Sequence, residues 1–358
     1  MKKIFIILYV FISLFLISGC KKENTVKSFV KVGMVTDSGT INDKSFNQGT
    51  WDGILQANAK LGIEAKYLKP NSISAEDYIE SIEQLIKDGY SIIVCPGFKF
   101  ETAIYSVQDK YPKVLFILLD GIPHNDDYSD THISPNVASV SWKEQEAGFI
   151  AAVASAVQIK KGEFGFIGGM EIPAVQKYNW GWQQGIAYAN SRLGTNITIH
   201  ANNVVYQGSF SNVAAGQELA ATIYDRGINV IFAAAGGVGE GVINEAKNRR
   251  YKGEDVWVVG VDVDQYDEGL LPNGTSAVLT SAMKYLSTAS FTLIKAALHN
   301  EFPGGQAVTL DSSVDGLGIP FENPNLSAEA QKAAADAEAD IKAGKITVAD
   351  KISGAMIR

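Results

Sequence analysis

The stretches FNQGTWDGI (residues 46–54) and YNWGWQQGI (residues 178–186) carry an aromatic residue, an Asn, two Gly and an Ile at the same positions. Each stretch follows an apolar run, at residues 30–36 and 164–168, that has the composition of a buried strand. Each also opens a segment whose apolar residues recur at helical spacing. We therefore predict two similar halves, each of which begins with a strand, a loop and a helix.

Strand-like and helix-like segments alternate through both halves. In the first half we expect strands at residues 30–36, 63–68, 91–95, 114–119 and 137–141, and helices at 48–60, 75–87, 101–110 and 143–157. In the second half we expect strands at residues 164–168, 197–206, 229–233 and 256–261, and helices at 175–193, 212–226 and 239–250. Apolar strands that alternate with helices predict parallel sheets covered by helices on both faces. The predicted fold class is α/β, with two doubly wound lobes.

The chain is expected to pass between the lobes three times, near residues 141–146, 280–285 and 310–320. These crossings assign residues 30–144 plus about 282–312 to lobe 1, and residues 145–281 plus about 313–358 to lobe 2. Open α/β sheets bind ligands outside the carboxyl ends of their strands. Two facing lobes would therefore bind a ligand in the cleft between them, and closure about a hinge would bury it from both sides.

The N-terminal twenty residues have the pattern of a lipoprotein signal. Two lysines at residues 2–3 precede an apolar run at residues 4–17, which is too short to span a bilayer comfortably, and small residues stand directly before Cys20. The pattern resembles a bacterial lipobox, in which the cysteine is lipidated and becomes the first residue of the mature protein. We predict a signal peptide at residues 1–19, and a lipidated cysteine with its tether at residues 20–29. The protein would then be anchored to the cell membrane outside the cytoplasm.

Composition and motifs exclude several classes of function. The 358-residue chain has 31 Lys and Arg against 39 Asp and Glu, a net charge of −8, so a nucleic-acid binder is not expected. With two cysteines and four histidines, neither a disulfide framework nor a metal site is expected. The segment GGVGEG at residues 236–241 misplaces the third glycine of a dinucleotide fingerprint, and no P-loop is present. We therefore expect no cofactor.

Candidate ligand-binding side chains lie at the predicted strand ends. They are the carboxylates Asp37, Asp120, Asp262 and Asp264 and the aromatic residues Phe46, Phe98, Phe100, Tyr178, Trp182 and Phe232. Phe46 stands in a polar loop, where a ring has no obvious role in a core. Aromatic faces stack on flat rings, whereas carboxylates accept hydrogen bonds from hydroxyl and N–H groups and repel phosphate. These residues indicate a neutral polar ligand with a ring, such as a nucleoside or a sugar; paired acids would also serve a glycosidase.

A longer string, VGMVTDSGTINDKSFNQ at residues 32–48, resembles the opening of the basic membrane protein family of lipoproteins, which are substrate-binding components of ABC importers. The later strings VIFAAAGG (230–237), VGVDVDQY (259–266), GLGIP (316–320) and GKITV (344–348) are also similar to blocks of that family. The resemblance runs from about residue 30 to the end and is greatest for the spirochaete purine nucleoside receptor A branch. It implies a type I periplasmic-binding-protein fold that binds purine nucleosides (adenosine, guanosine or inosine). The ligand would pass to ABC permease and ATPase subunits, without catalysis.

The resemblance also implies roles for individual residues. The purine would lie between Phe46 and Phe232. Asp37 and Asn47 would bind the edge of the base. The segment at residues 172–182 is more aromatic and richer in amides than the family pattern, so the contacts of lobe 2 with the base stay open.

On the sugar side, Asp264 and Lys284 would bind the ribose hydroxyls, and Gly236 would let the backbone approach the ligand. Asp120 and Trp182 are further candidates, because they lie at a strand end and on the repeated helix. Three alternatives remain: a sugar-binding protein of the same fold, an extracytoplasmic nucleoside hydrolase, and a surface adhesin.

Overall fold

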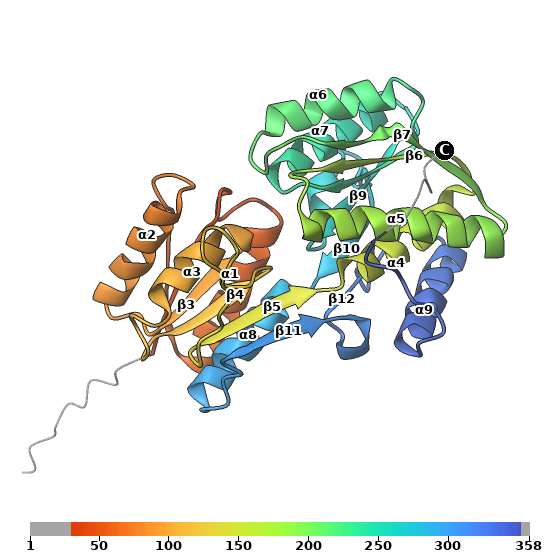
Figure 1. Cartoon of the computed structure of the whole chain (residues 1–358). Coiled ribbons are helices and arrows are strands. Elements are labelled where there is room, and N and C mark those ends of the chain that lie inside the picture. Colours follow the sequence, from red (N-terminus) through yellow and green to blue (C-terminus); the bar gives the residue numbers. More distant parts are fainter. Residues whose placement is uncertain (1–29, 352–358) are drawn as a thin grey trace, which may run out of the picture.

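The computed structural model describes residues 30–351. The predicted signal peptide and Cys20 lie outside the described residues. The described chain forms two α/β lobes that lie side by side (Figure 1). Each lobe has a six-stranded sheet with helices on both faces. The predicted α/β class with two doubly wound lobes is confirmed.

Lobe 1 contains a fully parallel sheet with the strand order β11-β5-β4-β3-β1-β2. Its strands are β1 (Lys31–Val35), β2 (Glu64–Leu68), β3 (Ile92–Pro96), β4 (Leu115–Leu119), β5 (Val137–Trp142) and β11 (Gln306–Leu310). Its helices are α1 (Phe46–Leu61), α2 (Ala75–Lys87), the short η1 (Phe98–Phe100), α3 (Glu101–Val107) and α8 (Leu286–Leu298). Alternate residues of β3 enter two cores: Ile92 and Val94 pack with residues of α1, whereas Ile93 and Cys95 pack with residues of α2 and α3.

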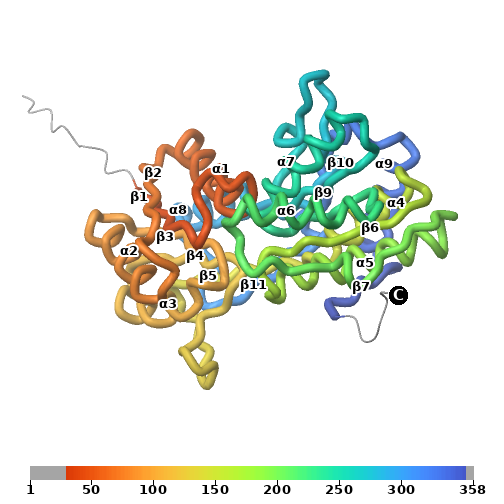
Figure 2. Tube along the Cα trace, turned by 90° about the horizontal axis from the view of Figure 1, so that it is seen from above, coloured from red at the N-terminus to blue at the C-terminus, as the bar shows by residue number. Residues whose placement is uncertain are grey.

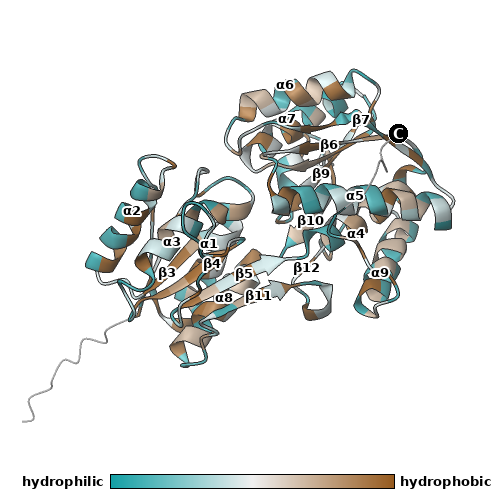
Figure 3. Ribbon diagram, viewed as in Figure 1, coloured by the Kyte–Doolittle hydropathy of each residue, from teal (hydrophilic) through white to brown (hydrophobic). Residues whose placement is uncertain are grey.

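Lobe 2 contains a sheet with the order β12-β10-β9-β8-β6-β7, in which only the β10–β12 pair is antiparallel. Its strands are β6 (Lys161–Gly168), β7 (Asn196–Tyr206), β8 (Val230–Ala234), β9 (Trp257–Asp262), β10 (Val278–Lys284) and β12 (Leu317–Gly318). Its helices are α4 (Glu144–Ile159), α5 (Pro173–Arg192), α6 (Val213–Tyr224), α7 (Gly237–Tyr251) and α9 (Ala328–Lys342), with the short η2 (Asp267–Gly269) and η3 (Ser312–Val314). Figure 3 shows apolar strands inside both lobes and hydrophilic residues on outer helices such as α2.

The repeated sequence pattern has the same packing role in both lobes. A Cβ atom on Gly53 of α1 would lie 2.4 Å from the carbonyl oxygen of Ser287 in α8. In lobe 2, a Cβ atom on the equivalent Gly185 of α5 would lie 2.5 Å from the carbonyl oxygen of Phe149 in α4. In each lobe the repeated helix therefore approaches its neighbour closely because glycine leaves room for the neighbour's backbone.

Three connections link the lobes: β5 to α4, β10 to α8, and β11 to β12. They are tied to one another by hydrogen bonds. The backbone N–H of Lys143 donates to the carbonyl of Leu310, and that of Tyr285 donates to the carbonyl of Gly316, both at 3.0 Å. The indole of Trp142 also donates to the carbonyl of Gly316, at 3.0 Å. Figure 2 shows the two lobes and their connections from above.

Within residues 30–351, no helix has both the length and the hydropathy needed to cross a bilayer.

Candidate ligand-binding cleft

A cleft lies between the lobes at the carboxyl ends of the strands of both sheets. It contains about 640 Å³ of space between atoms, part of which is open to solvent, within the range of small-molecule sites. Lobe 1 lines it with residues that follow β1, β3 and β4, and lobe 2 lines it with residues at the ends of β8, β9 and β10 and at the start of α5. Six of the nine predicted site residues line this cleft: Asp37, Phe46, Asn47, Asp120, Gly236 and Lys284.

Phe232 and Trp182 do not line the cleft, contrary to the sequence-based expectation. Both side chains are fully buried in the core of lobe 2, where their ring centroids are 5.2 Å apart. The Phe232 ring also packs against Phe166 and Tyr178, at 5.4 and 5.7 Å. The physical reason is its place inside β8, a strand buried along its whole length. A side chain in such a strand packs under a helix, so the core already surrounds the Phe232 ring.

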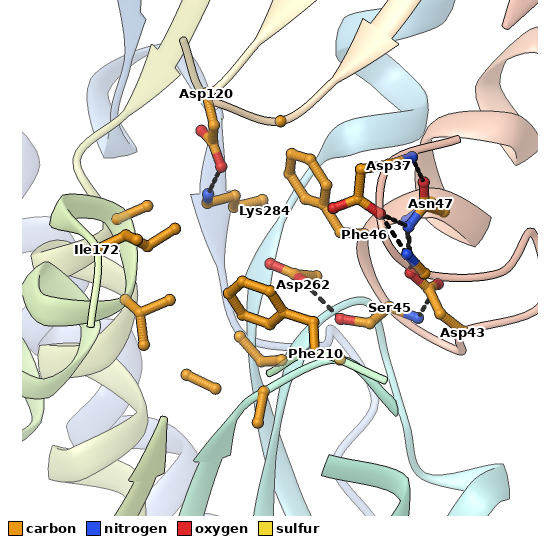
Figure 4. A pocket seen from close by; sticks show the side chains of 18 of the residues that line it. Asp37, Asp43, Ser45, Phe46, Asn47, Asp120, Ile172, Phe210, Asp262 and Lys284 are labelled. Atoms are coloured by element: carbon orange, nitrogen blue, oxygen red, sulfur yellow. Dashed lines mark hydrogen bonds and ion pairs between the residues drawn. The ribbon is translucent and has the colours of Figure 1, made fainter. Parts of the chain in front are cut away.

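The predicted aromatic candidates Phe98 and Tyr178 line the cleft together with Phe46, and so does Phe210, which the sequence analysis missed. It lies in the loop between β7 and α6, and its ring enters the cleft from lobe 2 while Phe46 enters from lobe 1 (Figure 4). Its signal in the sequence is the one that marked Phe46: a lone aromatic residue in a polar loop, QGSFSN at residues 207–212.

Glycines hold the Phe210 loop in place. The N–H of Gly237 donates to the carbonyl of Phe210 at 2.8 Å, and Gly236 has a φ of +55° beside the same carbonyl. A Cβ atom on Gly169 would lie 2.3 Å from the Phe210 ring. The glycines after β6 and β8 therefore make room for an aromatic loop beside the ligand cleft.

Asp264 also lies outside the cleft, and Asp262 lines it instead. Strand β9 ends at Asp262. Two residues later the exposed Asp264 side chain accepts the N–H of Tyr266 at 3.0 Å, which forms a local turn. The strand-end prediction had already named Asp262, whereas the family resemblance pointed to Asp264, which the structure places in the turn after the strand.

The base-edge residues proposed from the sequence form a closed hydrogen-bond network. The side-chain amide of Asn47 donates to Asp37 Oδ1 and to Asp43 Oδ2, both at 2.7 Å, and its oxygen accepts the backbone N–H of Asp37 at 3.1 Å. Asp43 also accepts the N–H groups of Ser45 and Gln48, both at 3.0 Å, at the start of α1. Asn47 therefore has all its amide hydrogens in use, and its geometry fixes the orientation of Asp37.

Asp37 keeps one carboxylate oxygen for the cleft. Oδ1 accepts hydrogen bonds from Asn47 and from the backbone of Gly39, at 2.7 and 2.8 Å. Oδ2 points toward the ring of Phe46 and the backbone of Gly97. Burial raises the pKa of Asp37, and the hydrogen bonds to Gly39 and Asn47 partly oppose this rise. The free oxygen is a well-oriented acceptor beside an aromatic face.

The opposite part of the cleft holds a buried lysine among carboxylates. Lys284 Nζ pairs with Asp120 Oδ2 and, at 2.9 Å, with Glu144 Oε1. Asp120 and Asp262 end corresponding strands of the two lobes and both have left-handed backbone conformations, with φ of 55° and 66°. Backbone conformations of this kind are found at functional sites, where the surrounding structure maintains them. Both carboxylates line the cleft, and the ammonium lies 5.3 Å from the centroid of the Phe46 ring.

Burial and neighbouring charges perturb the pKa values in this cluster. Burial raises the pKa of Asp120 to about 6, because the attraction of Lys284 does not fully offset the loss of solvation. Burial also raises the pKa of Asp262. For Lys284, burial lowers the pKa, but the nearby carboxylates Asp120, Glu144 and Asp262 outweigh burial and the net pKa is raised. Lys284 is therefore a permanently charged group in the cleft.

The loop before α1 also bridges the two lobes directly. Ser45 Oγ donates to Asp262 Oδ2 at 2.5 Å, and the side-chain amide of Gln265 donates to the carbonyl of Lys44 at 2.8 Å. Lys44 Nζ lies 3.4 Å from Glu268 Oε1. The loop directly before Phe46 thus contacts the end of β9 and the loop that follows it.

No group of His, Cys, Asp and Glu side chains among the described residues has the arrangement of a metal site. The cleft instead places carboxylates and one lysine around several aromatic rings, in an arrangement suited to reversible binding.

Residues 30–351 match the family model of PnrA-like ABC transporter substrate-binding proteins. The chain belongs to this family. It is 31% identical over 356 residues to the ABC transporter nucleoside-binding protein BmpA of Lactococcus lactis subsp. cremoris, a match that covers 95% of this chain and 96% of that protein. It is 29% identical to basic membrane protein D of Borreliella burgdorferi, over 89% of this chain and 86% of the relative. The predicted membership of the basic membrane protein family is confirmed.

Solved structures show the same fold. A solute-binding protein of an ABC transporter from Aeropyrum pernix K1 superposes with a TM-score of 0.75 at 22% identity, over 89% of this chain and 92% of that one. A periplasmic solute-binding protein from Actinobacillus succinogenes with bound D-allose gives a TM-score of 0.60 at 15% identity, over 81% and 97%. The two lobes and the cleft between them are therefore those of the type I periplasmic-binding-protein fold.

Membership of the family establishes the general role of the protein. It is the substrate-binding component of an ABC transporter and not an enzyme. Such components bind their substrate outside the cytoplasm and act together with a permease and ATPase subunits.

Proposed function

We propose that this protein binds purine nucleosides in the cleft and delivers them to its permease. The observation that carries the proposal is the pair of phenylalanine rings, Phe46 and Phe210, which enter the cleft from opposite lobes with carboxylates around them. Two such rings suit a flat aromatic base, since stacking contributes about 1–3 kcal/mol per base. The Lactococcus lactis relative, which is described as nucleoside-binding, supports the same ligand class.

In this proposal the base edge contacts Asp37. The free Oδ2 atom accepts a hydrogen bond from an N–H group of the purine, while Asn47 holds the carboxylate in place from behind. Asn47 therefore acts through Asp37 and does not contact the base itself. Gly236, beside Phe210, lets the backbone approach the ligand closely.

The ribose lies near Lys284 in this proposal. Asp120 and Asp262 accept hydrogen bonds from its hydroxyl groups, and Lys284 donates to its oxygen atoms. A phosphate group is disfavoured because the carboxylates outnumber the single lysine among the lining residues of the cleft. The site is thus expected to bind nucleosides and to reject nucleotides.

The attachment of the protein to the membrane by a lipid is part of the same proposal. Cys20 would carry the lipid, and the residues between it and β1 would form the tether to lobe 1. Motion about the three connections would open the cleft for uptake and close it on the ligand. Mass spectrometry of the N-terminal peptide, before and after treatment with hydroxide, tests the lipidation of Cys20.

Calorimetry tests the proposed ligand. The full chain is purified in detergent, unfolded and refolded to remove any bound ligand, and titrated with adenosine, guanosine, inosine, ribose and galactose. We expect heat with at least one nucleoside and none with the sugars. Heat with a sugar alone would overturn the proposal in favour of a sugar-binding protein. Chromatography of the nucleoside after incubation separates binding from hydrolysis, because a binding protein leaves the nucleoside intact.

A further inference from the structure

We propose that Glu144 is a positioning residue for Lys284: it holds the ammonium group in the cleft whether the lobes are open or closed. The inference rests on the proposed function, because it explains how one ligand-binding group keeps its place. Glu144 does not line the cleft, and nothing in its sequence context marked it as part of the site.

The geometry places Glu144 directly behind Lys284. Glu144 Oε1 lies 2.9 Å from Lys284 Nζ, and the two side chains are only 1% and 2% exposed. The other oxygen of Glu144 lies 3.3 Å from Lys177 Nζ. Lys177 in turn donates to the carbonyl of Trp142 at 3.2 Å, within the first connection between the lobes. Glu144 is therefore held between two lysines and has little freedom to move.

The two partners of Lys284 belong to different lobes. Asp120 follows β4 of lobe 1, whereas Glu144 begins α4, which packs against β10 of lobe 2, the strand that carries Lys284. Opening of the lobes would separate Lys284 from Asp120 but leave its pair with Glu144 intact. A buried ammonium group without a counter-charge is strongly disfavoured. Glu144 supplies that counter-charge in both states.

Asp120 is available to the ligand because Glu144 also compensates the charge of Lys284. Its Oδ1 atom is buried and has no hydrogen-bond partner among the described residues, and the residue lines the cleft. A hydroxyl group of the ligand could satisfy this atom without leaving Lys284 uncompensated, because Glu144 remains. The charged groups that face Lys284 are Asp120, Glu144 and Asp262. The Tyr178 ring lies 5.6 Å from its ammonium.

The test compares two isosteric variants on the same helical turn. Glu144→Gln removes the charge next to Lys284. Glu146→Gln makes the same change two residues later, on a buried side chain that accepts the N–H of Ser312 at 2.9 Å and does not contact Lys284. With inosine, guanosine and adenosine as probes, we expect the E144Q variant to bind about tenfold more weakly or worse. We expect the E146Q variant to bind like the wild type.

The pH dependence of binding gives a readout that a merely structural role would not change. In the wild type, affinity falls as the pH drops through the raised pKa of Asp120, about 6. The charge of Glu144 contributes to this rise. In the E144Q variant the acid-side loss of affinity therefore begins at lower pH. Wild-type affinity with an unchanged pH profile, or equal losses in both variants, would overturn the proposal.

Circular dichroism checks whether the E144Q variant folds. If it does not fold, a double variant provides the test instead. Lys284→Met combined with Glu144→Gln removes the ammonium together with one of the carboxylates that it faces, so fewer buried charges are left uncompensated than in Lys284→Met alone. If Glu144 acts through Lys284, this double variant binds nucleosides as weakly as Lys284→Met alone. A further loss would show that Glu144 acts elsewhere. Absence of nucleoside binding by the wild type in the same titrations would instead refute the proposed function.

Discussion

At the scale of single residues, loop aromatics differ from strand aromatics in what they can contact. Phe46 is the first residue of α1 and Phe210 lies in the loop before α6, and both line the cleft. Phe232 lies within a buried strand and packs in the core. The sequence alone indicates this difference, because residues 230–233 form an uninterrupted apolar run that predicts a fully buried strand. The family resemblance placed Phe232 against the ligand because it matched a block of sequence, whereas the structure places that ring in the core of lobe 2.

The two lobe 2 phenylalanines therefore give opposite results on substitution. Phe210→Ala should weaken nucleoside binding by about 1–3 kcal/mol and leave stability nearly unchanged, because the ring is half-buried in a loop. Phe232→Ala should lower the free energy of unfolding by about 3–5 kcal/mol through the cavity that it leaves. Calorimetry and urea unfolding of both variants measure these effects. Strong binding by the Phe210 variant would remove that ring from the site.

Asn47 gives a second prediction at this scale. In an Asn47→Leu variant, Asp37 loses a side-chain donor and an acceptor for its backbone N–H, so the carboxylate is no longer held beside Phe46. We expect an affinity for nucleosides at least about tenfold lower, with a loss of about 1–2 kcal/mol in folding stability. The exposed Asn42 in the same loop is the control, and Asn42→Leu should have no effect on calorimetric titration. If both variants bind alike, the orientation of Asp37 does not depend on Asn47.

At the scale of helices and strands, close packing in the two lobes depends on the repeated glycines. Residues 181 and 185 of α5 face the backbone of α4, as residue 53 of α1 faces the backbone of α8. Helix α4 is buried along nearly its whole length and begins at one of the connections between the lobes. The contact between α4 and α5 therefore fixes the start of α5, where Ile172 and Tyr178 line the cleft.

Substitution of one glycine tests this packing. In Gly181→Ala, the new methyl group would meet the Gln145 carbonyl at 2.0 Å, so α5 must move away from α4. We expect the free energy of unfolding to fall by about 1–3 kcal/mol. The matched control is Ala187→Leu on the exposed side of the same helix, where we expect a change within about 0.5 kcal/mol. Equal unfolding midpoints in urea for the two variants would contradict the role of Gly181.

At the scale of the whole molecule, the loop before α1 connects the two lobes through contacts of the protein with itself. Ser45 is bonded to Asp262, and the Lys44 carbonyl accepts from Gln265. These contacts between the lobes are expected to stabilise the closed arrangement together with the ligand.

Removal of the Ser45 hydroxyl should shift this balance. Ser45→Ala removes the hydrogen bond to the buried Asp262 carboxylate across the lobes, so the ligand-free protein should spend more time open. Small-angle scattering should show a larger radius of gyration than for the wild type, and added nucleoside should restore the wild-type value. Ser72→Ala, in an exposed loop of lobe 1, serves as the control. An unchanged radius in the Ser45 variant would mean that this contact does not hold the lobes together.

The sequence predicts the two-lobed arrangement of the sheets better than it predicts the strands at the sheet edges. Alternating apolar strands and amphipathic helices determine both sheets, and strand-end carboxylates such as Asp37 and Asp120 follow from the fold. Strand β11 has no predicted counterpart because it lies at a sheet edge and is half-exposed, so it lacks an apolar run. The pairing of Glu144 with Lys284 also could not be predicted, because it joins residues brought together only by the connections between the lobes.

Because the two halves of the sequence are similar, a position at which they differ can show how the two sides of the cleft differ. When residue 46 is matched with residue 178, Asp37 corresponds to Gly169, and the space above Gly169 is filled by the Phe210 ring. One half presents an acid where the other presents an aromatic face. A cleft whose two halves differ in this way can favour one orientation of an asymmetric ligand. The orientation of an asymmetric ligand in the cleft is therefore expected to depend on this difference between the two halves.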